Sequence, residues 1–209
     1  MSKLKLCGIR REEDVEYLNE FPPDYAGFIF ASTRRYVSPE MAKMLISRLD
    51  PRIKSVGVFV DMPISEMKAF ADMLDVFQLH GGEDEEYISQ LREIIPEKCE
   101  IWKAVRLKVP EDIDRAEMLT ADRLLIDAYD PKEYGGTGKS ARIDLIINRE
   151  IKKPFFIAGG ISAENIADVN RLLGGRAYGF DVSSGIETDG VKDREKIRLL
   201  TEIFRKELI

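Results

Sequence analysis

The most informative stretch of the sequence is "FFIAGGISAEN", residues 155–165. It begins with four apolar residues that occupy both faces of the expected strand, which is typical of a parallel strand covered on both sides. Gly159 and Gly160 interrupt the chain, and Ser162 then precedes apolar residues at helical spacing. The stretch therefore predicts a strand that leads through a glycine turn into a helix, the repeating unit of α/β proteins.

The same strand-to-helix pattern recurs along the chain. Strands are expected at residues 3–7, 25–30, 53–60, 75–79, 100–106, 122–127, 154–158 and 177–181. Helices are expected to start at Ser38, where Pro39 follows, and at Ser162, and a last helix is expected over residues 192–206. The strand starts are 22 to 32 residues apart, which leaves room for one helix and two short loops in each unit.

Eight such units predict the fold class α/β, with a (β/α)8 TIM barrel as a single domain over residues 1–209. A doubly wound parallel sheet has similar periodicity and is the alternative. We prefer the barrel because the eight units leave no segment over, and no linker or low-complexity tract divides the chain.

Composition limits the kind of partner. The chain has 32 basic and 38 acidic residues, a net charge of −6, and no basic block of the kind that binds nucleic acid. No apolar run approaches the roughly 20 residues of a membrane helix, and the first ten residues lack the apolar core of a signal peptide. We expect a cytoplasmic protein with no nucleic-acid or membrane partner. The sequence makes no prediction of oligomeric state.

In a TIM barrel the active site lies at the carboxyl ends of the strands. The expected strand ends are Cys7, Phe30, Val60 with Asp61, His80, Arg106, Asp127, Gly159 with Gly160, and Asp181. A thiol, an imidazole, a guanidinium and two carboxylates should therefore meet at one mouth. Because strand side chains alternate, a Cys7 that points into the barrel implies that Lys5 does so too, and Lys5 would then need an acidic partner.

Two glycine and serine stretches predict phosphate binding. Gly159 and Gly160 offer bare backbone N–H groups before a helix, while Ser183 and Ser184 follow the eighth strand. Barrels frequently bind phosphate between these two loops. A third stretch, "DPKEYGGTGKSAR" at residues 130–142, has Glu133 where a nucleotide-binding P-loop needs its first glycine. It is either a surface loop or a lid over the substrate.

The motifs "KLCGIR", "TRRYVSPE", "QLHGGE", "GGTGKS" and "DVSSGIE", in this order over nearly the whole chain, resemble the phosphoribosylanthranilate isomerase family. The resemblance implies a TIM barrel that works without metal or organic cofactor. The implied reaction is the Amadori rearrangement of N-(5-phosphoribosyl)anthranilate to 1-(2-carboxyphenylamino)-1-deoxyribulose 5-phosphate in tryptophan biosynthesis. The implied partner is this small phosphosugar substrate.

The resemblance also implies an acid–base pair. Cys7 matches the general base that removes the proton from ribose C2, and Asp127 matches the general acid that protonates the ring oxygen. A thiolate base requires positive charge nearby, so we expect Lys5 to lower the pKa of Cys7 below its usual value of about 8.5. Asp127 must hold a proton near neutral pH. Asp130 competes for the acid role, but Asp127 is preferred because it ends a strand.

The remaining roles follow from the same resemblance. Arg35 matches the ligand of the anthranilate carboxylate, although Arg34 beside it could share this role. Asp181 matches a residue near the sugar hydroxyls, and His80 is expected to line the pocket. The phosphate cradle consists of Gly159, Gly160, Ser183 and Ser184.

Three other functions remain open at this point. The Amadori isomerase of histidine biosynthesis shares the barrel and phosphate loops, but resembles a two-carboxylate enzyme with aspartate where Cys7 stands. A catalytically silent sugar-phosphate-binding barrel would be expected to lack Cys7 or Asp127. The chain could also be one module of a bifunctional enzyme.

Overall fold

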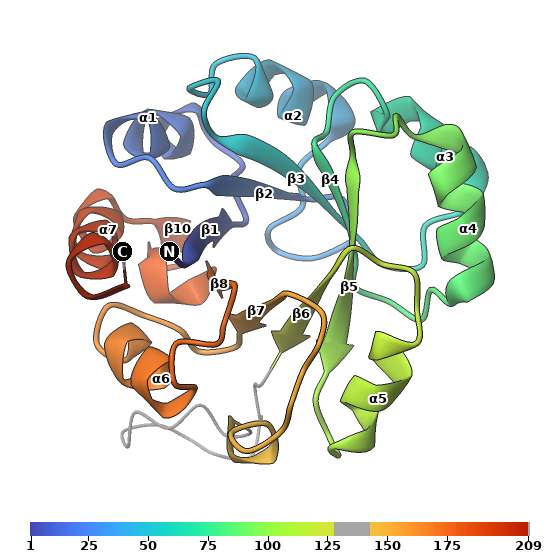
Figure 1. Ribbon diagram of the computed structural model, residues 1–209. Coiled ribbons are helices and arrows are strands. Elements are labelled where there is room, and N and C mark those ends of the chain that lie inside the picture. Colours follow the sequence, from blue (N-terminus) through green and yellow to red (C-terminus); the bar gives the residue numbers. More distant parts are fainter. Residues whose placement is uncertain (128–142, 209) are drawn as a thin grey trace.

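The computed structural model describes residues 1–127 and 143–208 (Figure 1). Eight parallel strands pair in sequence order, and β1 pairs with β8 to close the barrel. The strands are β1 (Lys3–Cys7), β2 (Tyr25–Ile29), β3 (Lys54–Phe59), β4 (Val76–Leu79), β5 (Glu100–Arg106), β6 (Arg123–Asp127), β7 (Phe155–Ala158) and β8 (Gly179–Val182). The prediction of a TIM barrel is confirmed, and the doubly wound alternative is wrong because that sheet would be open.

Helices form a ring around the barrel (Figure 1). They are α1 (Glu12–Glu20), α2 (Pro39–Ile46), α3 (Ile64–Met67), α4 (Glu85–Ile94), α5 (Glu111–Glu117), α6 (Ile166–Leu172) and α7 (Arg194–Leu208). Short 3-10 turns are η1 (Lys68–Phe70), η2 (Ile143–Leu145) and η3 (Ser184–Ile186). Within residues 1–127 and 143–208, no helix combines the length and apolar character that crossing a membrane requires.

Local side chains determine where the helices begin. The Ser38 hydroxyl accepts a hydrogen bond from the Met41 backbone N–H (3.2 Å), so α2 starts as predicted. In contrast, α6 begins at Ile166, four residues later than predicted. The Asn165 side chain accepts from the Ser162 N–H (2.9 Å) and donates to the Gly160 carbonyl (2.8 Å), which holds residues 162–165 in a turn. Gly159 and Gly160 therefore do not lie at the N-terminus of α6.

The expected last helix over residues 192–206 starts later, at Arg194, because residues 187–192 form an antiparallel hairpin. Its strands are β9 (Glu187–Thr188) and β10 (Val191–Lys192). Asp189 and Gly190 connect them with φ values of 51° and 78°. Two successive residues with positive φ are the signature of a type I′ hairpin turn, for which Asp-Gly is a favoured pair.

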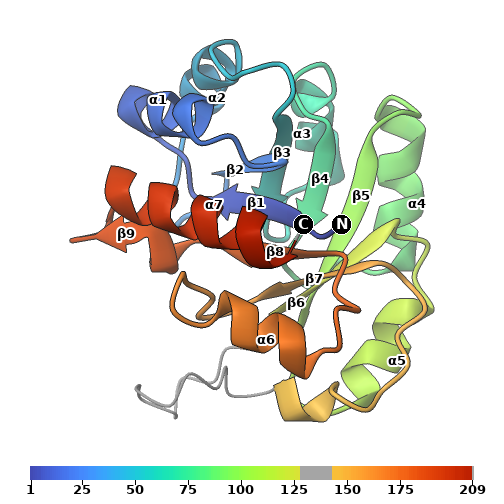
Figure 2. The ribbon, with the colours of Figure 1, turned by 60° about the vertical axis from the view of Figure 1, so that its left-hand side comes forward.

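The barrel interior is divided into an apolar and a polar layer. Near the amino ends of the strands, the Trp102 and Phe156 rings stack with centroids 4.5 Å apart, and Tyr25 packs edge-on against Trp102 at 4.9 Å. Toward the carboxyl ends, the buried interior side chains include Lys5, Gln78 and Asp181. A second and larger apolar core lies between the barrel and its helices. Figure 2 shows the arrangement of the strands and these helices in a second view. The apolar layer closes one end of the barrel, so the polar layer opens toward the other.

Candidate active site

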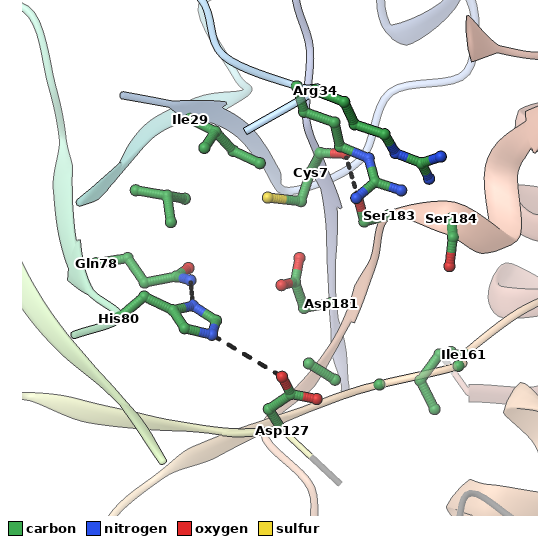
Figure 3. Close-up of a pocket in the computed structure, with 15 residues that line it drawn as sticks. Cys7, Ile29, Arg34, Gln78, His80, Asp127, Ile161, Asp181, Ser183 and Ser184 are labelled. Atoms are coloured by element: carbon green, nitrogen blue, oxygen red, sulfur yellow. Dashed lines mark hydrogen bonds and ion pairs between the residues drawn. The ribbon is translucent and has the colours of Figure 1, made fainter. Parts of the chain in front are cut away.

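A cavity of about 500 Å³ opens at the carboxyl ends of the strands (Figure 3). The nine residues for which the sequence predicts a catalytic or substrate-binding role all line it: Cys7, Arg35, His80, Asp127, Gly159, Gly160, Asp181, Ser183 and Ser184. They come from β1, β6, β8 and the loops after β2, β4, β7 and β8. Arg106 was expected at the same mouth, but its side chain is exposed and lies outside the cavity lining. The guanidinium groups come instead from Arg34 and Arg35.

Cys7 is the last residue of β1, and its thiol points into the cavity (Figure 3). Its strand partner is Gly27 of β2. A Cβ atom at position 27 would lie 2.7 Å from Cys7 Sγ, so the glycine provides the space that the thiol occupies. The second cysteine, Cys99, is buried outside the cavity, and its thiol donates to the Leu74 carbonyl at 3.2 Å.

The acidic partner expected for Lys5 is Asp181. Lys5 Nζ lies 2.9 Å from Asp181 Oδ1, and the two residues are paired across β1 and β8. The Lys5 side chain is 0% exposed and that of Asp181 is 9% exposed. Burial opposes the charge on Lys5, but the attraction of Asp181 and Cys7 outweighs it and raises the pKa of Lys5. The ammonium group is therefore held in its charged form inside the barrel.

The expectation that the pKa of Cys7 is lowered is wrong for the ligand-free protein. Burial raises the pKa of the Cys7 thiol, and the opposing effect of Lys5 is too small to reverse this. Asp181 adds negative charge nearby and so offsets part of the Lys5 contribution. Cys7 is thus mainly a neutral thiol at neutral pH.

Asp127, the last residue of β6, faces His80 across the cavity (Figure 3). Asp127 Oδ2 lies 3.9 Å from His80 Nε2. The other ring nitrogen of His80, Nδ1, lies 3.1 Å from Nε2 of Gln78. The side chains of Gln78, His80 and Asp127 thus lie in a row, and the last of them is the proposed acid. Asp130 and the motif "GGTGKS", including the proposed lid over residues 130–142, lie outside the described residues.

The proposed phosphate cradle is formed by the loops after β7 and β8. Gly159 and Gly160 have φ values of 92° and 69°, a region that favours glycine and leaves the backbone bare. Ser183 Oγ donates to the Cys7 carbonyl at 3.1 Å, and Ser184 begins the η3 turn. Hydroxyl and backbone groups of two loops therefore surround one side of the same cavity that contains Cys7.

Sequence reasoning did not identify the carboxylate that holds Arg35. Glu187 accepts two hydrogen bonds from Arg35, at Nε and Nη2, each at 2.7 Å. It also accepts from Arg34 at 3.2 Å and from Lys192 at 2.9 Å. Burial opposes its ionisation, but the hydrogen bonds from Arg35 and Lys192 lower the pKa of Glu187 to about 2. Arg35 is consequently fixed in the wall of the cavity.

Glu187 and Lys192 come from the β9–β10 hairpin, which could have been found in the sequence. The dipeptide Asp189-Gly190 lies between two short extended segments and is a strong hairpin signal. Burial lowers the pKa of Lys192 even though Glu187 favours its charged form. Among the described residues, no three His, Cys, Asp or Glu side chains gather closely enough to hold a metal ion.

The chain is similar to members of one enzyme family along nearly its whole length. The family model of N-(5'phosphoribosyl)anthranilate (PRA) isomerase matches residues 4–203. N-(5'-phosphoribosyl)anthranilate isomerase of Thermoanaerobacter sp. (strain X514) is 40% identical over 207 residues, which is 98% of each chain.

Solved structures agree with this comparison. Phosphoribosyl anthranilate isomerase from Thermotoga maritima has a TM-score of 0.84 and 31% identity, covering 99% of this chain and 100% of its own. A second phosphoribosyl anthranilate isomerase structure, with a TM-score of 0.81 and 27% identity, covers the same shares of the two chains. That protein is in complex with reduced 1-(o-carboxyphenylamino)-1-deoxyribulose 5-phosphate.

Proposed function

Since the chain belongs to the N-(5'-phosphoribosyl)anthranilate isomerase family and is an isomerase of tryptophan biosynthesis, we propose that Cys7 and Asp127 carry out its reaction as base and acid. The substrate is N-(5'-phosphoribosyl)anthranilate, and the product is 1-(2-carboxyphenylamino)-1-deoxyribulose 5-phosphate. The observation that carries this proposal is the meeting of Cys7, Asp127 and the proposed phosphate cradle in one cavity.

In the first step, Asp127 donates its proton to the ring oxygen of the ribose. The bond between C1 and this oxygen breaks, and the nitrogen lone pair forms a C=N bond, which gives a protonated Schiff base. The step needs no electron acceptor, because the bonding electrons stay within the substrate.

In the second step, Cys7 removes the proton from C2. The electrons of the C–H bond form a C1=C2 double bond while those of the C1=N double bond return to nitrogen, which neutralises the Schiff base. Transfer of the C2 hydroxyl proton to C1 then gives the ketone. Although burial raises the pKa of Cys7, the positive charge of the Schiff base next to C2 favours the thiolate when it is required. Lys5 contributes a second, permanent positive charge.

The other groups bind the substrate. Arg35 binds the anthranilate carboxylate through its Nη1 side, since Glu187 occupies Nε and Nη2. Asp181 accepts a hydrogen bond from a sugar hydroxyl. Gly159, Gly160, Ser183 and Ser184 hold the phosphate with backbone N–H and hydroxyl donors. The reaction transfers protons only, so the proposal includes no cofactor.

The proposal is tested by the fluorescence of freshly generated N-(5'-phosphoribosyl)anthranilate, whose decay is followed with and without protein. The Cys7→Ala and Asp127→Asn variants should each lose on the order of 10²–10⁴-fold in kcat. Matched controls are Cys99→Ala, at the buried cysteine outside the cavity, and Asp72→Asn, at an exposed aspartate. Wild-type decay at the spontaneous rate, or full activity in either cavity variant, would refute the assignment.

A further inference from the structure

Gln78 is a buried polar residue in the wall of the cavity to which neither the proposed acid–base pair nor the phosphate cradle gives a role. It lies on β4, two residues before His80, which follows the strand, and both residues line the cavity. Gln78 is 1% exposed. Nε2 lies 3.1 Å from His80 Nδ1, whereas Oε1 has no hydrogen-bond partner among the described residues (Figure 3).

The orientation of the Gln78 amide determines which ring nitrogen of His80 carries the proton. If Nε2 of Gln78 donates to Nδ1, then Nδ1 is the acceptor and the neutral ring has its proton on Nε2. That proton faces Asp127 Oδ2, which is 3.9 Å from Nε2. If the amide turns by 180°, Oε1 accepts from Nδ1–H, and the Nε2 lone pair faces the carboxylate instead.

Two energetic arguments favour the first orientation. An N–H group that faces an aspartate is attracted to it, whereas a lone pair that faces a carboxylate is repelled. The turned amide would also place Nε2 of Gln78 where Oε1 now lacks a partner. An unpaired buried N–H is rarer in proteins than an unpaired carbonyl oxygen.

We propose that Gln78 is a positioning residue that keeps the His80 proton on Nε2, directed at Asp127. The inference rests on the proposed role of Asp127 as the acid. When Asp127 gives up its proton, the new carboxylate is next to a neutral N–H donor.

The chain contains one histidine, so protein labelled with 15N-histidine has a single pair of ring nitrogen signals. The signals are recorded without substrate at alkaline pH, in the range where they no longer change with pH and the ring is neutral. The wild-type protein should show unprotonated Nδ1 and protonated Nε2. Gln78→Glu, whose carboxylate only accepts, should move the proton to Nδ1. Gln78→Met, which neither donates nor accepts in its place, should shift the signals toward a mixture of tautomers.

The chain offers a matched control, since its other glutamine, Gln90, lies exposed on α4. Gln90→Met should leave the ring signals unchanged. A wild-type protein with the proton on Nδ1, or a Gln78→Met variant with wild-type signals, would overturn the proposal. If Gln78→Glu does not fold, the comparison of wild type, Gln78→Met and Gln90→Met still decides the question.

Kinetics then connect the tautomer with the reaction. Gln78→Met should lower kcat about 10-fold, less than the loss of an acid or base, while KM changes by less than about 2-fold. A changed tautomer with unchanged kcat would refute the positioning role. Because the spectra are recorded without substrate, the tautomer that they report does not depend on whether Cys7→Ala and Asp127→Asn lose activity as proposed. The two proposals can therefore fail separately.

Discussion

Lys5 Nζ and Asp181 Oδ1 form a 2.9 Å ion pair inside the barrel, on the two strands whose pairing closes it. The pair lies where many barrels have apolar side chains that fill the interior. Removing one member of a buried ion pair leaves an unpaired charge, which costs far more than the pair itself contributes. The pair therefore links the stability of the barrel to the electrostatics of the active site.

The first prediction concerns this pair. Lys5→Met or Asp181→Asn alone should each lower the free energy of unfolding by about 3–5 kcal/mol, because each leaves one buried charge without a partner. The double variant Lys5→Met/Asp181→Asn should lose clearly less than the sum of the two. Urea unfolding of all four proteins measures this coupling. Strict additivity would show that the two charges are stabilised independently.

The second prediction uses the close contact between β1 and β2. Gly27→Ala places a Cβ atom 2.7 Å from Cys7 Sγ and 3.1 Å from Cys7 Cα. The thiol must move, so we expect kcat to fall by about 10- to 100-fold and the free energy of unfolding to fall by about 1–3 kcal/mol. In the control Gly82→Ala, the new atom lies 3.6 Å from its nearest neighbour, Asp61 Oδ1, and both quantities should stay near wild type.

The third prediction is the pH at which Cys7 becomes reactive. Because burial raises the pKa of this thiol, its thiolate fraction at neutral pH should be below that of a free cysteine. In a Cys99→Ala background, the rate of alkylation by iodoacetamide should rise with pH to a midpoint above about 8.5. A midpoint below about 8.5 would contradict the dominance of burial.

The fourth prediction concerns Glu187 and acid stability. Its pKa of about 2 in the folded protein lies below the usual glutamate value of about 4.3, a difference that corresponds to about 3 kcal/mol. This stabilisation is fully present above the pKa of Glu187 in the unfolded chain, about 4.3, and is lost as the pH falls from there through about 2. Glu187→Gln should therefore be less stable than wild type at pH 7, and the difference should close at pH 2.

Guanidinium chloride unfolding at several pH values measures this difference. The exposed Glu97→Gln provides the control, which should follow wild type at every pH. A gap between wild type and Glu187→Gln that is as large at pH 2 as at pH 7 would show that the effect is not due to the charge of Glu187.

The fifth prediction separates the two neighbouring arginines. The Arg35 side chain is 20% exposed and held by Glu187 through two hydrogen bonds, whereas that of Arg34 is 64% exposed and makes one at 3.2 Å. Arg35→Ala should raise KM by about 10- to 100-fold, and Arg34→Ala by less than about 3-fold. Steady-state kinetics of both variants test this order, and the reverse order would move the carboxylate site to Arg34.

Much of this architecture was readable in the sequence, because it depends on local periodicity. Apolar runs at regular spacing located the eight strands, and the end of each strand pointed to residues such as Cys7 and Asp127. Strand alternation alone predicted that Lys5 accompanies Cys7 into the barrel and needs an acid, although it could not identify Asp181.

Other features depend on the balance between several contacts, and the periodicity of the sequence does not predict these contacts. Burial and Asp181 raise the pKa of Cys7, whereas Lys5 lowers it. Together they raise the pKa, which is opposite to the effect of Lys5 alone. The late start of α6 depends on hydrogen bonds of the Asn165 side chain. The sequence does not identify Glu187 as the partner of Arg35, because the two residues are 152 positions apart. The nearby Asp189-Gly190 turn, in contrast, is a local signal in the sequence.

The distance in sequence between Lys5 and Asp181, 176 residues, has a consequence for the newly made protein. As the ribosome extends the chain, β1 emerges early, but the counter-charge of its lysine is synthesised near the end. Any compact form that enclosed Lys5 before then would bury an unpaired ammonium, which is strongly unfavourable. The ion pair therefore disfavours burial of Lys5 before β8 has been synthesised. Only a chain that includes β8 can close the barrel around β1 with the charge of Lys5 paired.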